Sequence, residues 1–169
     1  MTQGLAECLA PLQIKDQVEI ECMTLAEGPF GIESVLDNQR VVLPLRQVVL
    51  QREDADAFVI ACYSDPGLAL CREATQKPVY GIQESGWFSA LQRGSRVGVV
   101  ALGPKSIARH LTYIRALGIE SRLAAERPLM LSVAQSEETS AYPRIEEVAR
   151  TLVEQDMADT LLMLSLIHI

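Results

Sequence analysis

Cysteine and histidine are scarce in this chain, and the few that occur are scattered. The 169 residues include two histidines, His110 and His168, and four cysteines (Cys8, Cys22, Cys62, Cys71). No two cysteines have C-x-x-C spacing, and the histidines lie too far apart to form a metal-binding motif. This usage argues against a disulfide framework and a zinc site, and it suits a reducing compartment. We therefore expect a cytoplasmic protein that binds no metal.

Positive charge and long apolar runs are also lacking. The chain has 15 Lys and Arg against 22 Asp and Glu, a net charge of -7, so no basic face is available to neutralise the phosphates of a nucleic acid. No uninterrupted apolar run reaches the roughly 18 residues that would cross a membrane. The N-terminus has neither the basic region nor the apolar core of a signal peptide. What is present, 49% hydrophobic and 22% charged residues, is ordinary for one compact domain.

Short apolar segments alternate with amphipathic ones along the chain, which is the pattern of an α/β fold. Strands are expected at residues 17–23, 56–62, 77–82, 95–102, 119–125 and 159–167. Helices are expected at residues 34–53, 65–75, 83–94, 103–118 and 141–156. Several strands are apolar throughout, which indicates a mainly parallel sheet with helices on both faces.

Particular residues refine three of the expected helices. Pro44 should kink the first helix or split it in two. Asp65 should cap the second helix, with Pro66 at its first position. Residues 103–118 carry an apolar stripe and end at Gly118, a helix stop; the stripe comprises Ile107, Leu111, Ile114 and Leu117.

Cys62 stands at the carboxyl end of an expected strand, where ligands bind in open parallel sheets. The helix that follows would offer free amides and a positive dipole end to the thiol. Such a setting lowers the pKa of a cysteine and favours the reactive thiolate. The alternative is that Cys62 is a small buried apolar residue with no chemistry, which is the more frequent role of a lone cysteine. Local physics leaves both interpretations open.

The most specific motif of the chain is "ACYSDPGL" (residues 61–68), followed by "REA" and "PVYGIQESG". Together with two further stretches, this motif resembles the hydantoin racemase branch of the aspartate/glutamate racemase superfamily. Upstream, "AEGPFGIES" is similar to a Gly-Pro-x-Ser-Ile-Glu-Ser loop of the family, with Gly31 where serine is common. Downstream, "RVGVVALGPKS" is similar to a Val-Val-Thr-Thr strand and loop. The resemblance extends to about residue 163 and implies two similar α/β halves, roughly 1–85 and 86–169, with the active site between them.

The resemblance implies racemisation without a cofactor, in which two thiols face opposite sides of a carbon next to a carbonyl. One thiolate removes a proton and the other thiol returns one. By position, Cys62 is one catalytic acid/base. The implied substrate-binding residues are Ile32, Tyr63, Ser64, Ala101 and Leu102. Ala101 and Leu102 stand where the family often has threonine, so two hydroxyls of its pattern are absent here.

The chain departs from the family pattern at both ends. The family begins with a strand ending in Asn-Pro-Asn-Ser/Thr, whereas this chain opens with "MTQGLAECLA", which is similar to the first helix. The family continues a strand such as "ADTLLML" into Gly-Cys, the second thiol, whereas this chain reads "LSLIHI". We therefore expect a racemase shortened at both ends that lacks the second cysteine and is inactive as written.

The implied substrate is a 5-substituted hydantoin, allantoin or an amino acid. Two alternatives stay open: a non-catalytic small-molecule-binding remnant of the racemase fold, and another activity of the superfamily such as maleate isomerisation. An arylmalonate decarboxylase is disfavoured, because that branch is expected to lack the first thiol. We also expect a homo-oligomer, with no nucleic-acid or membrane partner.

Overall fold

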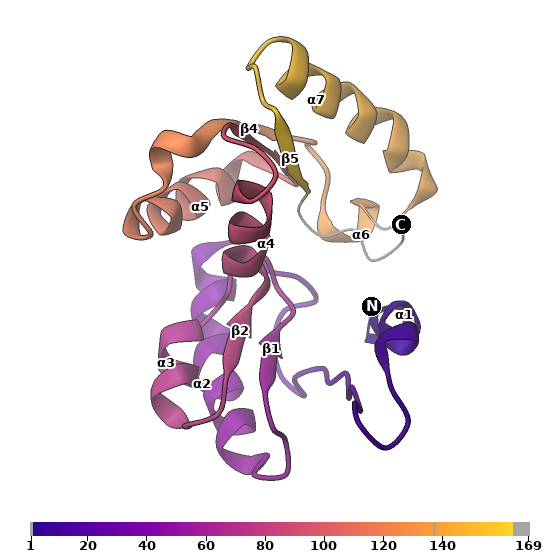
Figure 1. Cartoon of the computed structure of the whole chain (residues 1–169), viewed down its shortest axis with the longest axis vertical. Helices are drawn as coiled ribbons and strands as arrows, with labels where there is room; N and C mark the ends of the chain where they lie inside the picture. Colours follow the sequence, from indigo (N-terminus) through magenta and orange to yellow (C-terminus); the bar gives the residue numbers. More distant parts are fainter. Residues whose placement is uncertain (1, 137, 164–169) are drawn as a thin grey trace.

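A computed structural model describes residues 2–136 and 138–163 and gives an α/β fold with two parallel sheets (Figure 1). The first sheet pairs β1 (Phe58–Ile60) with β2 (Val79–Gly81). The second has the strand order β4-β3-β5 and consists of β3 (Val97–Ala101), β4 (Leu123–Pro128) and β5 (Thr160–Met163). All of these strand pairs are parallel. The expected α/β fold class is confirmed.

Helices connect and cover the strands. The α-helices are α1 (Thr2–Leu9), α2 (Val35–Gln51), α3 (Leu68–Ala74), α4 (Ile82–Leu91), α5 (Pro104–Ala116), α6 (Val133–Ser136) and α7 (Tyr142–Glu154). Short 3-10 helices occupy Ala10–Leu12, Glu120–Arg122 and Thr139–Ala141. Helix α4 lies between the two sheets in Figure 1, and the boundary that we expected near residue 85 falls inside it.

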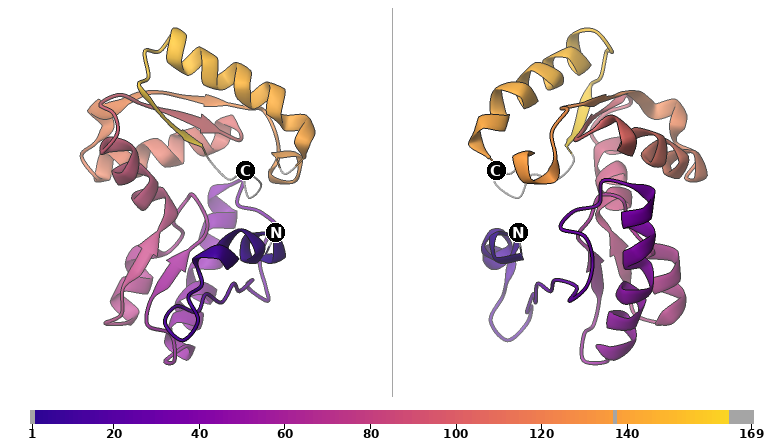
Figure 2. Two further views of the ribbon diagram at one scale, coloured as in Figure 1. Left: turned by 45° about the vertical axis from the view of Figure 1, so that its right-hand side comes forward. Right: turned by 180° about the vertical axis from the view of Figure 1, so that it is seen from behind.

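Helices α2 and α3 lie on the same side of the β1–β2 sheet (Figure 2). Their shared core contains five buried side chains: Val49, Ile60, Leu68, Cys71 and Val79. The opposite side of this sheet presents Val59 and Tyr80, which are 62% and 51% exposed. The alternation of buried and exposed residues along β1 and β2 is that of a sheet covered on one face.

The three-stranded sheet is covered on both faces, and its central strand β3 is buried along its whole length. Trp87 of α4 and Ile114 of α5 pack with Val97 and Val99 on one face. On the other face α7 supplies Ile145, Val148 and Leu152, which pack with Val100. Burial on both sides explains why residues 97–101 read as a continuous apolar run.

Two expectations about helices have different outcomes. Helix α2 begins with a capping box, in which the Ser34 hydroxyl accepts from the Asp37 amide and the Asp37 carboxylate accepts from the Ser34 amide. It then runs unbroken through Pro44, so of the two expected effects, a kink or a split, the split does not occur; Val41 and Val49, on either side of the proline, are buried. The predicted stop of α5 is confirmed, since Gly118 has a φ of 72°.

The strand predicted at residues 17–23 is wrong. Within the described part of the chain this segment forms no strand, and it contributes one bridge, between Ile14 and Val18. Alternating hydrophobicity favours a strand only when a neighbouring strand pairs with it, and no such neighbour is present among the described residues. No helix among those residues is both long and apolar enough to cross a bilayer.

Candidate active site

The turn after β1 (residues 62–67, the Cys62 turn) packs against the carboxyl end of β3. Tyr63 is 8% exposed and belongs to the same buried cluster as Ala101, the last residue of β3. The Trp87 indole donates a hydrogen bond of 3.1 Å to the Tyr63 hydroxyl. The side chain of Tyr63 therefore anchors the turn to residues of the second half of the chain.

Asp65 fixes the conformation of the Cys62 turn. Its two carboxylate oxygens accept hydrogen bonds of 2.9 Å from the amides of Gln83 and Glu84, in the first turn of α4. Burial raises the pKa of Asp65 to about 6. A methyl group on Gly81 would overlap this carboxylate, so the close approach requires glycine there.

The prediction that Asp65 caps the helix after Cys62 is therefore wrong. That helix, α3, begins at Leu68 with Gly67 as its N-cap, and Asp65 itself has a left-handed φ of 42°. The sequence pattern correctly indicated that Asp65 caps a helix, but we assigned it to the next helix in the chain. The carboxylate instead caps α4, which follows β2 and is next to the turn in space.

The Cys62 thiol is mostly buried, and its burial raises its pKa above the ordinary value. The backbone amide of Ser64 and the charge of Arg109 act in the opposite direction, but burial has the larger effect. The expectation that a helix N-terminus lowers this pKa is wrong, because α3 starts only at Leu68. Cys62 is thus a thiol at neutral pH that becomes a strong base once it loses its proton.

Arg109 of α5 reaches the Cys62 turn from the other half of the chain. Its Nε and Nη2 donate hydrogen bonds of 3.2 and 3.1 Å to the hydroxyl of Ser64. Next to it on the helix, His110 pairs with Glu126 of β4, with 2.5 Å between Nδ1 and Oε1. The His110 ring also stands edge-on to Tyr63, with 4.9 Å between ring centroids. The turn is therefore held by two side chains of α5, one of which is paired with Glu126 of β4.

The other expected site residues, Ala101, Leu102 and Ile32, lie in or next to loops that contact the segment after β4. The backbone oxygens of Ala101 and Leu102 accept hydrogen bonds from the amides of Leu129 and Leu131, which follow β4. Ile32 is half-buried in the loop before α2. This loop is tied to the start of α6, because the Glu33 carboxylate accepts from the Val133 amide at 3.2 Å.

Gly31 explains one departure from the family pattern noted in the sequence. A methyl group at this position would overlap the side chain of Val133 at the start of α6. The serine that is common in the family would therefore require the two loops to separate. Glycine lets the loop that carries Ile32 lie directly against the segment after β4.

Sequence reasoning did not identify Arg109, His110 or Glu126 as site residues. All three are polar groups in contact with the Cys62 turn or with each other, and the side chains of His110 and Glu126 are 5% and 2% exposed. A usable signal was present: Arg109 and His110 interrupt an amphipathic helix that starts at the carboxyl end of a buried strand. Nothing in the sequence around Glu126 indicated a site residue, because only the fold shows that it pairs with His110.

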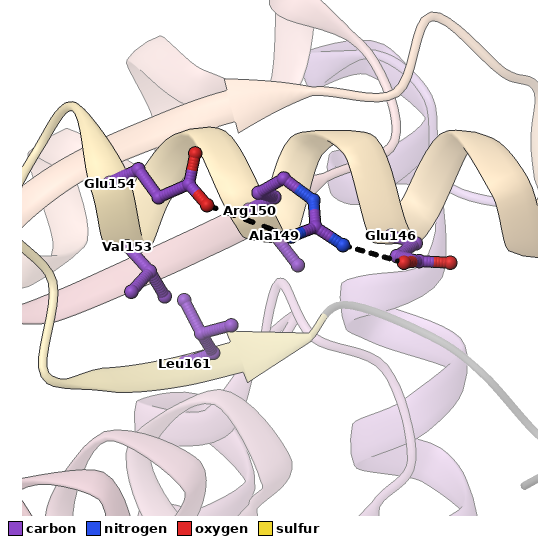
Figure 3. A pocket seen from close by; sticks show the side chains of 6 residues that line it. All are labelled: Glu146, Ala149, Arg150, Val153, Glu154 and Leu161. Carbon is purple, nitrogen blue, oxygen red and sulfur yellow. Dashed lines mark hydrogen bonds and ion pairs between the residues drawn. The ribbon is translucent and has the colours of Figure 1, made fainter.

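A shallow hollow elsewhere on the surface lies between α7 and β5 (Figure 3). Figure 3 shows Arg150 between Glu146 and Glu154, with which it forms ion pairs of 2.9 and 3.6 Å. The charged side chains of this hollow are thus paired with one another, and no residue of the Cys62 turn lines it. Within residues 2–136 and 138–163, no group of three histidine, cysteine or acidic side chains could hold a metal ion.

Known proteins match nearly the whole chain in sequence. The model of the Asp/Glu/Hydantoin racemase family matches residues 1–163. A hydantoin racemase from Pseudomonas sp. (strain NS671) is 29% identical over 167 residues, which are 96% of this chain and 67% of that protein. A hydantoin racemase from Paenarthrobacter aurescens is 29% identical over 150 residues, which are 85% of this chain and 63% of that protein.

The fold is also that of a solved racemase. Allantoin racemase from Klebsiella pneumoniae has a TM-score of 0.90 and 23% identity, over 97% of this chain and 68% of that one. The chain thus spans about two thirds of the length of the relatives that it matches. The family match over residues 1–163, together with these relatives, confirms the resemblance read from the three motifs: the chain belongs to the Asp/Glu/Hydantoin racemase family, in its hydantoin racemase branch.

Proposed function

We propose that the Cys62 turn performs cofactor-independent proton transfer at a carbon next to a carbonyl, as in a racemase of 5-substituted hydantoins or allantoin. The observation that carries this proposal is a partly buried thiol at a strand end, which the Ser64 amide and the charge of Arg109 influence electrostatically, while Arg109 itself is bonded to the Ser64 hydroxyl of the same turn. The relatives named hydantoin racemase and allantoin racemase support this substrate class.

In the proposed reaction the Cys62 thiolate takes the proton from the α-carbon and becomes a thiol. The electron pair of the broken C–H bond moves into the carbonyl group as an enolate, whose oxygen must be held by fixed donors. The amides of Tyr63 and Ser64 and the Ser64 hydroxyl would meet that oxygen, and Ile32, Ala101 and Leu102 would line the pocket. Inversion follows when a second acid delivers a proton from the opposite face.

The second acid/base is the part of the two-thiol mechanism that the described residues do not include. Its position in the family follows the strand that ends at Met163, and residues 164–169 lie outside the described residues. Of the cysteines other than Cys62, Cys71 is fully buried in the core between α2, α3 and the first sheet. None of the four cysteines follows residue 71. We therefore propose that this chain exchanges the α-hydrogen of its substrate faster than it inverts the carbon.

Proton NMR in D₂O combined with polarimetry tests this proposal. An optically pure 5-substituted hydantoin or allantoin should lose its α-hydrogen signal while its optical rotation changes little. Because burial raises the pKa of Cys62, the enzyme-dependent rate should increase about tenfold per pH unit from pH 7 into the alkaline range. Solutions without protein, at each pH, supply the background rate.

The alternatives predict other outcomes. A non-catalytic remnant would bind these compounds without exchange at any pH. Another activity of the superfamily, such as maleate isomerisation, would leave hydantoins unchanged and convert its own substrate. Absence of exchange with hydantoins, allantoin, aspartate and glutamate alike would contradict the racemase proposal.

A further inference from the structure

The Arg109 side chain has an unused hydrogen-bond donor beside the Cys62 turn. Nε and Nη2 donate to the Ser64 hydroxyl, whereas Nη1 is buried and has no acceptor among the described residues. One other buried side-chain nitrogen lacks an acceptor there, Nε2 of Gln83, and the amide of that residue binds Asp65 of the same turn. Buried donors without partners are rare in folded proteins, so the free Nη1 of Arg109, whose other nitrogens bind Ser64 of the Cys62 turn, indicates a place for a ligand with acceptor atoms.

The acidic groups around Arg109 are already engaged elsewhere. Arg109 interacts electrostatically with Glu126, Asp37 and the thiol of Cys62. The Glu126 carboxylate pairs with His110, and the Asp37 carboxylate accepts from Ser34 in the capping box of α2. Asp65, in the turn itself, accepts from two amides of α4. The guanidinium therefore forms its only hydrogen bonds within the described residues to a neutral hydroxyl.

This arrangement differs from that of a structural arginine. A buried arginine normally pairs with a carboxylate, often through two parallel bonds, because burial of an unpaired charge is unfavourable. Burial in fact lowers the pKa of Arg109, which is the sign of a cation held without a full counter-charge. Ser64 orients the guanidinium by two bonds, and the N–H groups of Nη1 stay available.

We infer that Arg109 is a further catalytic residue: its Nη1–H binds the carbonyl oxygen of the substrate, and its charge favours the Cys62 thiolate. The inference rests on the proposed function, in which the oxygen next to the reacting carbon gains negative charge. A fixed cation at that oxygen stabilises the enolate more than the neutral carbonyl, which lowers the barrier of proton removal. The same cation offsets part of the effect of burial on the thiol.

Two substitutions separate the charge from the directed donor. Arg109→Gln removes the charge, and Arg109→Lys keeps it while losing the planar fork that two bonds to Ser64 hold in place. The matched control is Arg115→Gln on the same helix, where the arginine forms a 2.8 Å ion pair with Glu120 on the surface. Circular dichroism and the urea midpoint of each variant show whether it remains folded.

The first readout is the rate of Cys62 alkylation by iodoacetamide between pH 6 and 10, mapped by mass spectrometry. Arg109→Gln should shift the midpoint of this profile upward by about one pH unit or more and slow alkylation at pH 7 about tenfold. Arg109→Lys should lie near the wild type, because its charge remains. An Arg109→Gln profile equal to those of the wild type and Arg115→Gln would overturn the effect of Arg109 on the thiolate.

The second readout is α-hydrogen exchange with the best substrate of the wild-type chain. Both Arg109 variants should lower kcat about 100-fold, while Arg115→Gln should not change it. Wild-type exchange rates in the Arg109 variants would overturn the contact with the carbonyl oxygen. A wild-type chain that exchanges no substrate would instead refute the proposed function and that contact together, and the alkylation profile would still decide whether Arg109 acts on Cys62.

Discussion

Replacement of Cys62 by serine is expected to abolish α-hydrogen exchange, lowering the rate about 100-fold or more. A serine hydroxyl is far less acidic than a thiol, so at neutral or mildly alkaline pH it cannot supply the base that removes the proton. Serine has nearly the same shape as cysteine, and the turn is fixed by Asp65 and Tyr63, so the fold should persist. Proton NMR in D₂O measures the loss directly.

Cys71→Ala is the matched control for this substitution. Cys71 is a second cysteine in the first half of the chain, but it is fully buried in the core on α3 and no part of the proposed reaction uses it. Its replacement should lower stability and leave the exchange rate per folded molecule unchanged. Equal rates in the wild type and Cys62→Ser would exclude Cys62 as the base.

Replacement of Asp65 by alanine is expected to destabilise the chain by about 2 kcal/mol or more. The substitution leaves the amides of Gln83 and Glu84 without their acceptor, and each buried unpaired group costs about 1–3 kcal/mol. Urea unfolding followed by the fluorescence of Trp87, the only tryptophan, measures the change. The exposed Asp56 offers a control, Asp56→Ala, which should stay within about 0.5 kcal/mol of the wild type.

The second half of this test uses Gly81. A methyl group there would overlap the Asp65 carboxylate, so Gly81→Ala should destabilise the chain by a similar amount. The two changes act on one contact, so their effects should not add in the double variant. Additive losses, or an Asp65→Ala variant as stable as the wild type, would show that this carboxylate does not fix the Cys62 turn.

Much of the second half of the fold was predictable from local pattern. Residues 97–101 are buried on both sides and are apolar at every position except Gly98, which identified the central strand. The stripe on α5 placed Ile114 in the core, and Gly118 ended the segment. Such features depend on the residue itself and its near neighbours, and these are visible in one sequence.

Tertiary partners explain the expectations that failed. Residues 17–23 alternate like a strand but have no strand beside them. Pro44 lies in a helix that continues with buried residues on both sides of it. Asp65 was assigned to the next helix in sequence, although its acceptor oxygens face α4. For Asp65 the deciding partner lies 18 positions away in the sequence, which local pattern does not show.

The candidate site was predictable only in part, for the same reason. Cys62 could be located from its place after an apolar strand. The resemblance to the family added the loops that carry Ile32, Ala101 and Leu102. For Arg109 the sequence showed a polar residue in an amphipathic helix after a buried strand, but nothing local indicates that it reaches Ser64, 45 positions earlier in the chain. The pKa of Cys62 also depends on burial in the fold, which reversed the shift expected from a helix N-terminus.

The most direct test of the account is protection of Cys62 by substrate. Iodoacetamide labelling at pH 9, mapped by mass spectrometry, is compared with and without a saturating 5-substituted hydantoin or allantoin. We predict that the ligand slows alkylation of Cys62 about tenfold or more and leaves that of the exposed Cys8 unchanged, because a bound substrate would cover one thiol only. Equal alkylation of Cys62 with and without these ligands would contradict the central claim that this turn is the substrate site.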